Sequence, residues 1–336
     1  MTGLDEGIWA LSEIGYLLRQ QEGEIHRARA FTRAAFELAR QRPELAALRK
    51  ANQLESIESV GAGIARVLAE VIDTGRSSYL ERLRELMGQP AAGDEPPLRL
   101  AGYRGDLHSH TEWSDGRATL PEMALAARAR GYRYLGVTDH SPRIAVVNGL
   151  NPERLRAQAR QIEETEALLP GLALLRGIEV DILEDGRLDL DEETLSGLEV
   201  VIASPHVKLR TEKAAMTQRM LRAVEHPQVN VVGHPTGRRP GSRAGAEYDF
   251  EAVFGRCAEL GVALEIDCDP ARMDAGPELA RLAAGLGCRF CLDSDAHAPD
   301  ELLYVDMAAW MARRAGIPED RILNWLELDD LRRALR

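Results

Sequence analysis

The chain has 336 residues and a formal net charge of −12 at pH 7, with 42 basic and 54 acidic side chains. This length can bury a large core and allows one large α/β domain beside a small one. The acidic balance argues against a protein that coats nucleic acid non-specifically, although bound divalent cations could still neutralise phosphate locally. No apolar run approaches ~18 residues and the N-terminus does not resemble a signal peptide, so we expect a cytoplasmic protein with no membrane partner.

The four cysteines are too few for a disulfide framework in a chain of this length. Cys288 and Cys291 have the C-x-x-C spacing of redox and zinc sites, but they have no second pair and lie at the start of an apolar run. Packing in the core is therefore the favoured interpretation of this pair.

Residues 1–88 are predicted to be helical, because apolar residues such as Ile8, Leu11 and Ile14 recur at spacings of three and four. A second helix is expected over residues 24–40, before Pro43. The following stretch, residues 54–76, is typical of two short helices joined by a glycine turn, whose amides could hold a nucleic-acid phosphate. An ordinary helical bundle with a tight turn is the alternative.

This block resembles the small N-terminal helix-hairpin-helix domain of family X DNA polymerases. The resemblance has two departures: Ser59 stands where the family usually has glycine, and Val67 stands where its lyase members carry a Schiff-base lysine. A covalent lyase activity is therefore not expected, whereas binding of DNA is.

Residues 89–102 are rich in proline, glycine and small residues and are predicted to be a linker. A family X polymerase would continue with a nucleotidyltransferase domain. This chain has no Gly-Ser nucleotide loop followed by an Asp-x-Asp pair, so templated synthesis is not expected.

From residue 103 onward, apolar runs alternate with amphipathic segments, the latter covering residues 120–130, 152–169, 211–225, 250–260 and 278–286. Seven apolar runs end near His110, His140, Asp181, His206, His234, Asp269 and His297. Buried strands separated by helices indicate a parallel sheet covered on both faces, and this number of repeats suggests a closed barrel. Active sites of such barrels lie at the carboxyl ends of the strands.

Six of the eight histidines lie at or just beyond the end of an apolar run. His108 and His110 are two residues apart, so in a strand both imidazoles project to one face, as metal ligands would. Asp115 adds an oxygen donor in the turn that follows. Two histidines held by hydrogen bonds on a half-buried strand are the alternative for His-x-His alone, but scattered core histidines would not all fall at strand ends.

The region from about 103 to 314 resembles the PHP (polymerase and histidinol phosphatase) family, and within it the PHP domain of bacterial family X polymerases. The resemblance is carried by ordered motifs: Asp-Leu-His-Ser-His at 106–110, Thr-Asp-His at 138–140, Gly-Ile-Glu-Val-Asp at 177–181, Ala-Ser-Pro-His at 203–206, Gly-His-Pro at 233–235 and Asp-Ser-Asp-Ala-His at 293–297. It implies a distorted (β/α)7 barrel over residues 103–336, an α/β fold preceded by the small all-α domain.

The resemblance also implies a site for three divalent metal ions. Its first metal would be held by His108, His110, Glu179 and Asp295; Glu179 would bridge to a second held by His206 and His234; Asp115, His140 and His297 would hold the third. Mixed imidazole and carboxylate ligands suit Mn²⁺, Zn²⁺ or Fe²⁺ rather than Mg²⁺ or Ca²⁺.

Catalysis is expected to depend on Glu179, Asp295, Arg238 and Arg272. The two arginines are favoured as phosphate ligands among the basic residues beyond strand ends, which also include Arg143, Lys208 and Arg210. Asp139 and Asp293, next to expected ligands, are candidates either for orienting imidazoles or for capping loops.

These observations predict a metal-dependent phosphoesterase acting on DNA ends or gapped DNA, as a 3′-to-5′ exonuclease or 3′-end-processing enzyme in repair. A separate polymerase or repair factor could work with it. A small-molecule phosphomonoesterase of the histidinol-phosphatase type is the alternative. A third hypothesis is a non-catalytic DNA-binding module, which the complete ligand set disfavours.

Overall fold

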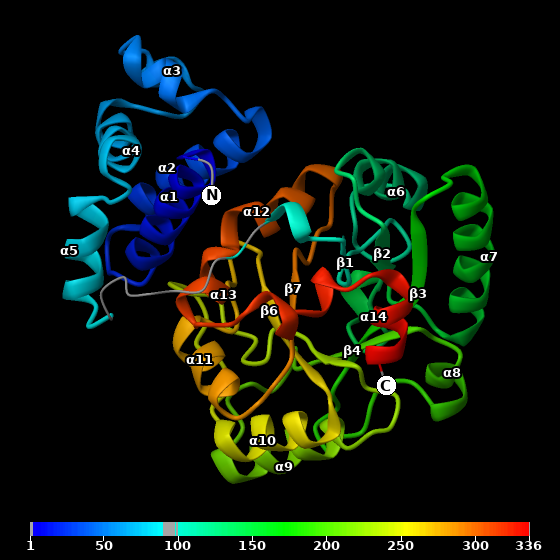
Figure 1. Cartoon of the computed structure of the whole chain (residues 1–336). Coiled ribbons are helices and arrows are strands. Elements are labelled where there is room, and N and C mark those ends of the chain that lie inside the picture. The colour runs from blue at the N-terminus through cyan, green and yellow to red at the C-terminus, as the bar shows by residue number, and fades with distance from the viewer. Residues whose placement is uncertain (1–2, 90–97, 99, 336) are drawn as a thin grey trace.

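A helical domain packs against one side of a parallel barrel in the computed structural model, which describes residues 3–89, 98 and 100–335 (Figure 1). The expected linker over residues 89–102 falls largely outside the described residues. The described part of the chain contains no helix that is both long and apolar enough to cross a lipid bilayer.

The helical domain is built around the long first helix, whose apolar residues Ile8, Leu11 and Ile14 are fully buried. The expected helix over residues 24–40 is found as α2, which packs along α1. The helices of this domain are α1 (Gly3–Arg19), α2 (Ile25–Gln41), α3 (Leu45–Lys50), α4 (Ala62–Thr74) and α5 (Ser78–Leu86).

Only one arm of the predicted helical hairpin is an α-helix. Its first arm is a short 3-10 turn, Leu54–Ser56, and its second is α4, which begins directly after Gly61. Ser59 adopts φ +65° in the turn between them. This left-handed conformation strains a residue with a side chain, which explains why glycine is the usual choice at this position.

The barrel has seven parallel strands in sequential order. They are β1 (Gly105–Asp106), β2 (Tyr134–Val137), β3 (Ala173–Asp181), β4 (Val200–Ser204), β5 (Val231–Val232), β6 (Ala263–Asp267) and β7 (Phe290–Asp293). Every residue of these strands except Ala173 and Arg176 is buried, as expected for a parallel sheet covered by helices. The four cysteines are buried and form no disulfide, in agreement with core packing.

The barrel is nearly closed between its first and last strands. In the described residues β1 and β7 share no ladder, but a parallel bridge joins Ser109 to Ala296 just beyond their ends. There the His110 backbone N–H donates to the Ala296 carbonyl at 2.8 Å. This bridge draws the two loops that carry most of the candidate ligands against each other.

Helices follow the strands and cover the barrel, close to their predicted bounds. They are α6 (Leu120–Ala129), α7 (Pro152–Leu168), α8 (Glu192–Ser196), α9 (Lys213–Val224), α10 (Phe250–Leu260) and α11 (Pro277–Gly285). Several begin on a side-chain cap, such as the Thr119–Glu122 capping box of α6 and Asn151 before α7. After β7 the chain adds α12 (Tyr304–Ala308), α13 (Trp310–Arg314) and α14 (Leu328–Ala334).

The helical domain contacts the barrel through α1 and α2, which pack on α12 and its neighbours (Figure 1). The Trp9 indole donates to the Asp306 carbonyl at 2.9 Å, and the rings of Tyr16 and Trp310 meet edge to face with centroids 5.6 Å apart. Buried residues of both parts belong to one continuous hydrophobic cluster. The helical domain is therefore seated on the barrel by a packed apolar interface.

Candidate metal centre

The predicted ligands gather at the carboxyl ends of the strands because each follows, or nearly ends, a strand of the barrel. His108 and His110 follow β1, His140 follows β2, Glu179 lies within β3, and the others follow β4, β5 and β7, with Asp115 in the loop after β1. The structure brings all of them into one cluster: His108, His110, Asp115, His140, Glu179, His206, His234, Asp295 and His297.

Glu179 is the centre of this cluster and is fully buried. Five imidazole nitrogens surround its two carboxylate oxygens: His234 Nε2 at 2.7 Å, His140 Nδ1 at 2.8 Å, His206 Nε2 at 3.1 Å, His108 Nε2 at 3.4 Å and His110 Nε2 at 3.6 Å. Burial alone would raise the pKa of Glu179, but the imidazoles, His206 foremost, hold it well below its ordinary value. The side chain is thus an anionic carboxylate with imidazole nitrogens close to both of its oxygens.

Asp295 completes one side of the cluster. Its Oδ1 lies 3.0 Å from His110 Nε2 and 3.7 Å from His108 Nε2. Burial opposes ionisation, but His108, His110 and Arg272 hold the pKa of Asp295 well below its ordinary value. Its backbone has φ +51°, a strained conformation that aims the side chain into the site.

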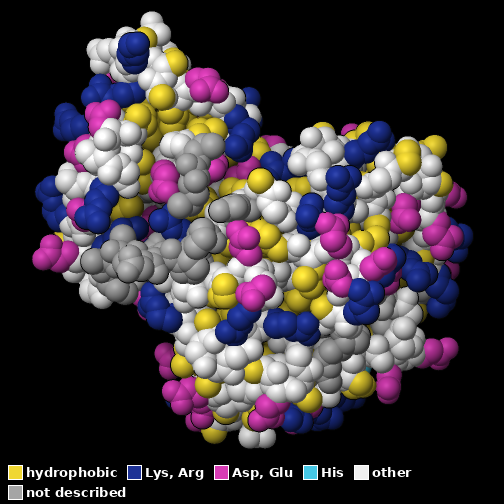
Figure 2. Space-filling view, in the orientation of Figure 1, with side chains coloured by type: hydrophobic (Ala, Val, Ile, Leu, Met, Phe, Trp, Pro, Cys, Tyr) yellow, Lys and Arg dark blue, Asp and Glu magenta, His cyan; other side chains and the backbone are white. Residues whose placement is uncertain are grey.

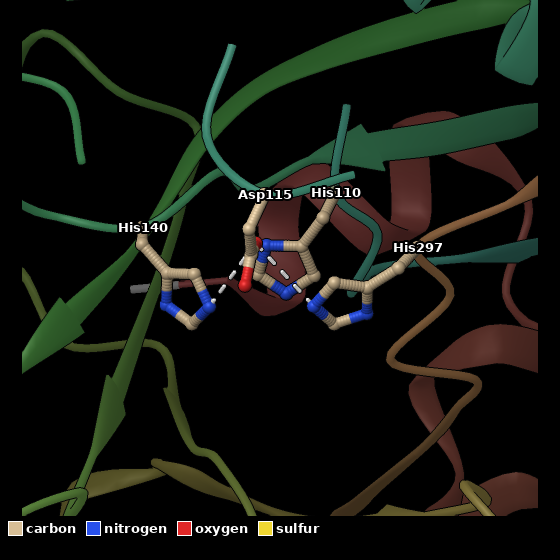
Figure 3. A group of neighbouring side chains, drawn as sticks. All are labelled: His110, Asp115, His140 and His297. Carbon is tan, nitrogen blue, oxygen red and sulfur yellow. Dashed lines mark ion pairs between the residues drawn. The ribbon is translucent and has the colours of Figure 1, made fainter. Parts of the chain in front are cut away.

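Asp115, His140 and His297 lie on the more open side, beside His110 (Figure 3). Asp115 Oδ1 is 3.4 Å from His297 Nε2 and 3.6 Å from His140 Nε2. Burial would raise the pKa of Asp115, but hydrogen bonding to His297 and the charge of nearby imidazoles lower it to about 2. The Asp115 side chain is 31% exposed, so this side faces solvent and could admit a substrate.

Many polar atoms of the cluster are buried without a hydrogen-bond partner among the described residues. They include His108 Nε2, His110 Nδ1 and Nε2, His140 Nδ1, Glu179 Oε2, His206 Nε2 and Asp295 Oδ1. Buried polar atoms are nearly always satisfied, so such a convergent set needs another partner. Imidazole nitrogens and carboxylate oxygens are donors that fit divalent transition metals.

Proximity divides the donors into three groups, and this division differs in part from the predicted one. His108, His110 and Asp295 form one group, and His140, Glu179 and His206 a second. Asp115, His140 and His297 form the third, together with His110. Thus His110 and His140 each stand in two groups, and the assignment of each ligand to one particular metal stays a prediction.

Two carboxylates to which the sequence analysis assigned no role at the site hold the imidazoles in place. Glu265, in β6, approaches His108 Nδ1 at 2.6 Å and accepts from the His234 backbone N–H at 2.5 Å. Asp181, at the end of β3, approaches His206 Nδ1 at 3.0 Å. Such partners fix the ring orientation and leave the other nitrogen free for a metal. The available signal was a carboxylate inside an apolar, buried strand.

Asp139 and Asp293 act on backbone and loops rather than on imidazoles. Asp139 accepts from the N–H and hydroxyl of Thr111 at 2.9 and 2.7 Å, and from the Ser114 hydroxyl at 2.5 Å. It thereby holds the loop that carries Asp115. Asp293 accepts from the Leu107 N–H at 2.8 Å and so ties β7 to β1. Of the two roles considered, the contacts favour loop anchoring.

Arg272 lies at the edge of the cluster, with its side chain only 8% exposed. Its Nε is 3.2 Å from Asp295 Oδ2 and 3.4 Å from Asp267 Oδ2. Burial alone would lower its pKa, but Asp295 and Asp267 raise it, so the guanidinium stays charged. Among the described residues its NH1 has no hydrogen-bond partner, so a donor remains for an anion.

Arg238 is engaged by the helical domain. It donates to the Tyr16 hydroxyl at 3.1 Å and to the Met273 carbonyl, and its guanidinium carbon lies 5.5 Å from the Tyr16 ring centroid. Its role as a phosphate ligand stays a prediction. Of the remaining loop cations, Arg143 pairs with Glu184 at 3.1 Å, whereas Lys208 and Arg210 are exposed after β4.

The helical domain has its own groove, at the N-terminus of α4. Gly61, Ala62 and Gly63 line it together with arginines and a tyrosine from α2, α4 and α5: Arg27, Arg66, Arg82 and Tyr79. Gly61 provides no side-chain cap, so the first amides of α4 are open to a ligand. Lysine and arginine side chains also lie along the outer left edge of this domain in Figure 2. Val67, buried at the groove, offers no amine for Schiff-base chemistry.

A parallel barrel with imidazoles and carboxylates converging at the carboxyl ends of its strands is the architecture of a metal-dependent hydrolase. The profile of the PHP domain matches residues 106–263, and that of a helix-hairpin-helix domain matches residues 5–77. The chain belongs to the PHP domain family, a family of metal-dependent phosphoesterases.

Two curated relatives frame the comparison. The "DNA polymerase/3′-5′ exonuclease PolX" of Bacillus subtilis (strain 168) is 35% identical over 239 residues, which are 71% of this chain and 42% of that protein. A "probable phosphatase" of Shewanella sp. (strain MR-4) is 30% identical over 233 residues, covering 66% of this chain and 87% of that protein. The chain therefore spans less than half of the first relative and most of the second.

Among solved structures, histidinol phosphate phosphatase from Lactococcus lactis, complexed with zinc, L-histidinol and phosphate, matches with a TM-score of 0.44 and 15% identity. The match covers 64% of this chain and 94% of that one.

Proposed function

We propose that this protein is a metal-dependent nuclease that trims DNA from the 3′ end, as an exonuclease or 3′-end-processing enzyme in repair. The observation that carries the proposal is the buried Glu179 carboxylate with five imidazoles around it, in a chain that also has a helix-hairpin-helix domain. Single-stranded ends and gapped duplexes are the expected substrates.

The proposed ligands are His108, His110, Asp115, His140, Glu179, His206, His234, Asp295 and His297, holding three divalent ions. When bound, Mn²⁺, Zn²⁺ or Fe²⁺ would supply the Lewis acidity that activates water near neutral pH and neutralises charge developing on phosphate. Low pKa values of about 3 for His110 and His234, caused first by burial, keep these imidazoles neutral and ready to bind metal.

The chain's own residues would bind and orient the phosphodiester. Arg272 holds a permanent positive charge at the edge of the site, where it can donate to a non-bridging phosphate oxygen. Glu265 and Asp181 keep His108 and His206 in fixed orientations and so preserve the site between turnovers. No side-chain nucleophile is needed in this scheme.

The helical domain supports DNA as the substrate. Its groove joins the open amides of α4 to the arginines at positions 27, 66 and 82, a combination suited to backbone phosphate. The exonuclease named among the relatives contributes to the same proposal.

A small-molecule phosphomonoesterase is the second candidate. It is favoured by the relative described as a probable phosphatase, of which the chain covers 87%. In that case the helical domain would have no part in substrate binding.

The deciding experiment is digestion of a 5′-labelled oligonucleotide, single-stranded and gapped, by manganese-loaded protein. We expect a ladder that shortens from the 3′ end and that is absent with Asp295→Asn. Asp300→Asn, which changes an exposed aspartate a few residues further on, is the matched control and should cleave normally.

Intact DNA together with hydrolysis of phosphomonoesters would refute the nuclease proposal and support the small-molecule phosphomonoesterase. Protein that binds no metal and hydrolyses neither substrate would support the non-catalytic DNA-binding module.

A further inference from the structure

The loop after β5 forms a tight antiparallel turn that places two arginines side by side. The Arg239 N–H donates to the Arg243 carbonyl at 2.9 Å, and the Arg243 N–H donates back to Arg239 at 2.8 Å. Residues directly opposite in an antiparallel pair project to the same face. The two guanidinium groups therefore leave the turn on one side.

This turn touches the helical domain at the end of α1. Gly241, at the tip, has φ +77°, and a Cβ added to it would lie 2.8 Å from the carbonyl oxygen of Arg19. Only glycine permits so close an approach in this conformation. Arg19, on α1, therefore lies against the turn that carries Arg239 and Arg243.

Within the part of the chain that the structure describes, none of the three arginines is in direct ionic contact with a carboxylate. No ion pair joins Arg19, Arg239 or Arg243 to an acidic side chain anywhere in residues 3–89, 98 and 100–335, and Arg243 Nε is buried without a hydrogen-bond partner. Arginines elsewhere on the barrel differ: Arg256, for example, pairs with both Glu225 and Glu259.

Cationic groups lie near these arginines on both sides, although Asp269 acts on Arg19 and Arg239, and Asp274 acts on Arg243. Burial lowers the pKa of Arg243, and the charges of Arg272 and Arg239 lower it further, whereas the Asp274 carboxylate opposes this shift. Burial likewise lowers the pKa of Arg19, an effect that Arg29 increases and Asp269 opposes. Like charges held together destabilise a fold by mutual repulsion, unless a bound anion relieves it. Positive charges thus extend from Arg29 on α2, through the three arginines, to Arg272 beside the metal centre.

We propose that Arg19, Arg239 and Arg243, here called the arginine path, bind the backbone of a single-stranded nucleic acid and lead its end to Arg272 and the metal centre. The proposal rests on the proposed nuclease function and adds the route of the strand. A single strand fits because the centre is recessed, with Glu179 and His108 fully buried. Several separate guanidinium groups suit successive phosphates better than one small phosphomonoester.

The test compares Arg239→Gln/Arg243→Gln with Arg156→Gln/Arg160→Gln, a control pair with the same charge change on exposed positions of α7. Each manganese-loaded protein is assayed on bis(p-nitrophenyl) phosphate and on oligothymidylate about 12 nucleotides long. We expect the path variant to lose about tenfold in kcat/KM on the oligonucleotide, mainly through KM, and to hydrolyse the small diester normally.

Salt dependence provides a second readout. Losing two phosphate contacts should reduce the slope of log(kcat/KM) against log[salt] by about 1.4, at ~0.7 per phosphate on a single strand. The control pair should leave both the slope and the rates unchanged. Equal losses on both substrates, or an oligonucleotide rate equal to that of the control pair, would overturn the arginine path.

Failure of the nuclease proposal is seen separately. If wild-type protein leaves the oligonucleotide intact, binding of a fluorescent oligothymidylate is measured by anisotropy with the same variants. About tenfold weaker binding by the path variant alone would uphold the arginine path without nuclease activity, whereas equal dissociation constants would overturn it. Arg19→Gln is an independent arm, because its backbone lies on the helical domain.

Discussion

Replacing Glu265 by glutamine should weaken metal binding without dismantling the barrel. The carboxylate is fully buried and serves two partners at once, His108 Nδ1 at 2.6 Å and the His234 backbone N–H at 2.5 Å. Glutamine has nearly the same shape but one acceptor oxygen and no charge. Glutamine can keep its acceptor oxygen on one of the two partners, but it then turns its NH₂ group toward the other partner.

The magnitude follows from those two contacts. A charge-assisted hydrogen bond is roughly twice as strong as a neutral one, so the retained bond loses ~1 kcal/mol and the lost one about 1.5–3 kcal/mol. We expect part of this lost hydrogen-bond energy to appear as a lower free energy of unfolding. The rest should appear as metal affinity about 10–100 times weaker, or ~1.4–2.7 kcal/mol, because His108 is no longer held in one tautomer and orientation.

Competition for Zn²⁺ between metal-free protein and a chelating indicator measures this affinity, with far-UV circular dichroism to verify folding. Glu259→Gln, at an exposed position of α10 where the side chain is 68% exposed, is the matched control and should bind metal as wild type does. A folded Glu265→Gln variant with wild-type affinity would refute the idea that this carboxylate orients the ligands.

Three further outcomes are expected. Glu179→Gln should abolish hydrolysis of every substrate while thermal melting still shows a cooperative fold; full activity would mean that Glu179 is not a required metal ligand. Tyr16→Phe removes the hydroxyl that Arg238 donates to and should lower the free energy of unfolding by ~1 kcal/mol, measured in urea. An unchanged free energy of unfolding would mean that this contact does not stabilise the protein. Burial would lower the pKa values of His206 and His297, but Glu179 and Asp181 around the first, and Asp115 and Asp295 around the second, raise both to about 9. In metal-free protein both imidazoles therefore hold protons below pH 9 that a metal must displace, so affinity should rise about tenfold per pH unit for each proton displaced and level off above pH 9. Calorimetry in buffers of different ionisation enthalpy counts the protons released, and an affinity independent of pH from 6.5 to 9 would contradict this assignment.

The barrel could be predicted from the sequence because its signals are local. Buried parallel strands read as short apolar runs, and helices begin at residues such as Thr119 and Asn151 whose side chains cap them. Strand ends of a parallel barrel meet at one rim whatever the details of packing. The sequence therefore predicts that residues following the strands, such as His140 and His234, come together, and the structure places both within reach of Glu179.

The sequence could not tell which donors share a metal, nor what holds them. Whether His110 stands with Asp295 or with Asp115 depends on ring orientation, which packing decides. For Asp139 the sequence leaves open whether it orients an imidazole or caps a loop; it lies against Thr111, because the loop after β1 folds over it.

What the sequence by itself determined is the order of strands and helices and the chemical identity of the residues at the rim. Only the tertiary structure decided that Glu265 orients His108 from a strand 157 positions away, and that Tyr16 on the helical domain binds Arg238 on the barrel. The physical reason is the sequence separation over which each kind of interaction acts. Hydrophobic periodicity and capping act between residues a few positions apart, whereas the partners of a buried carboxylate or guanidinium are chosen by how distant segments pack.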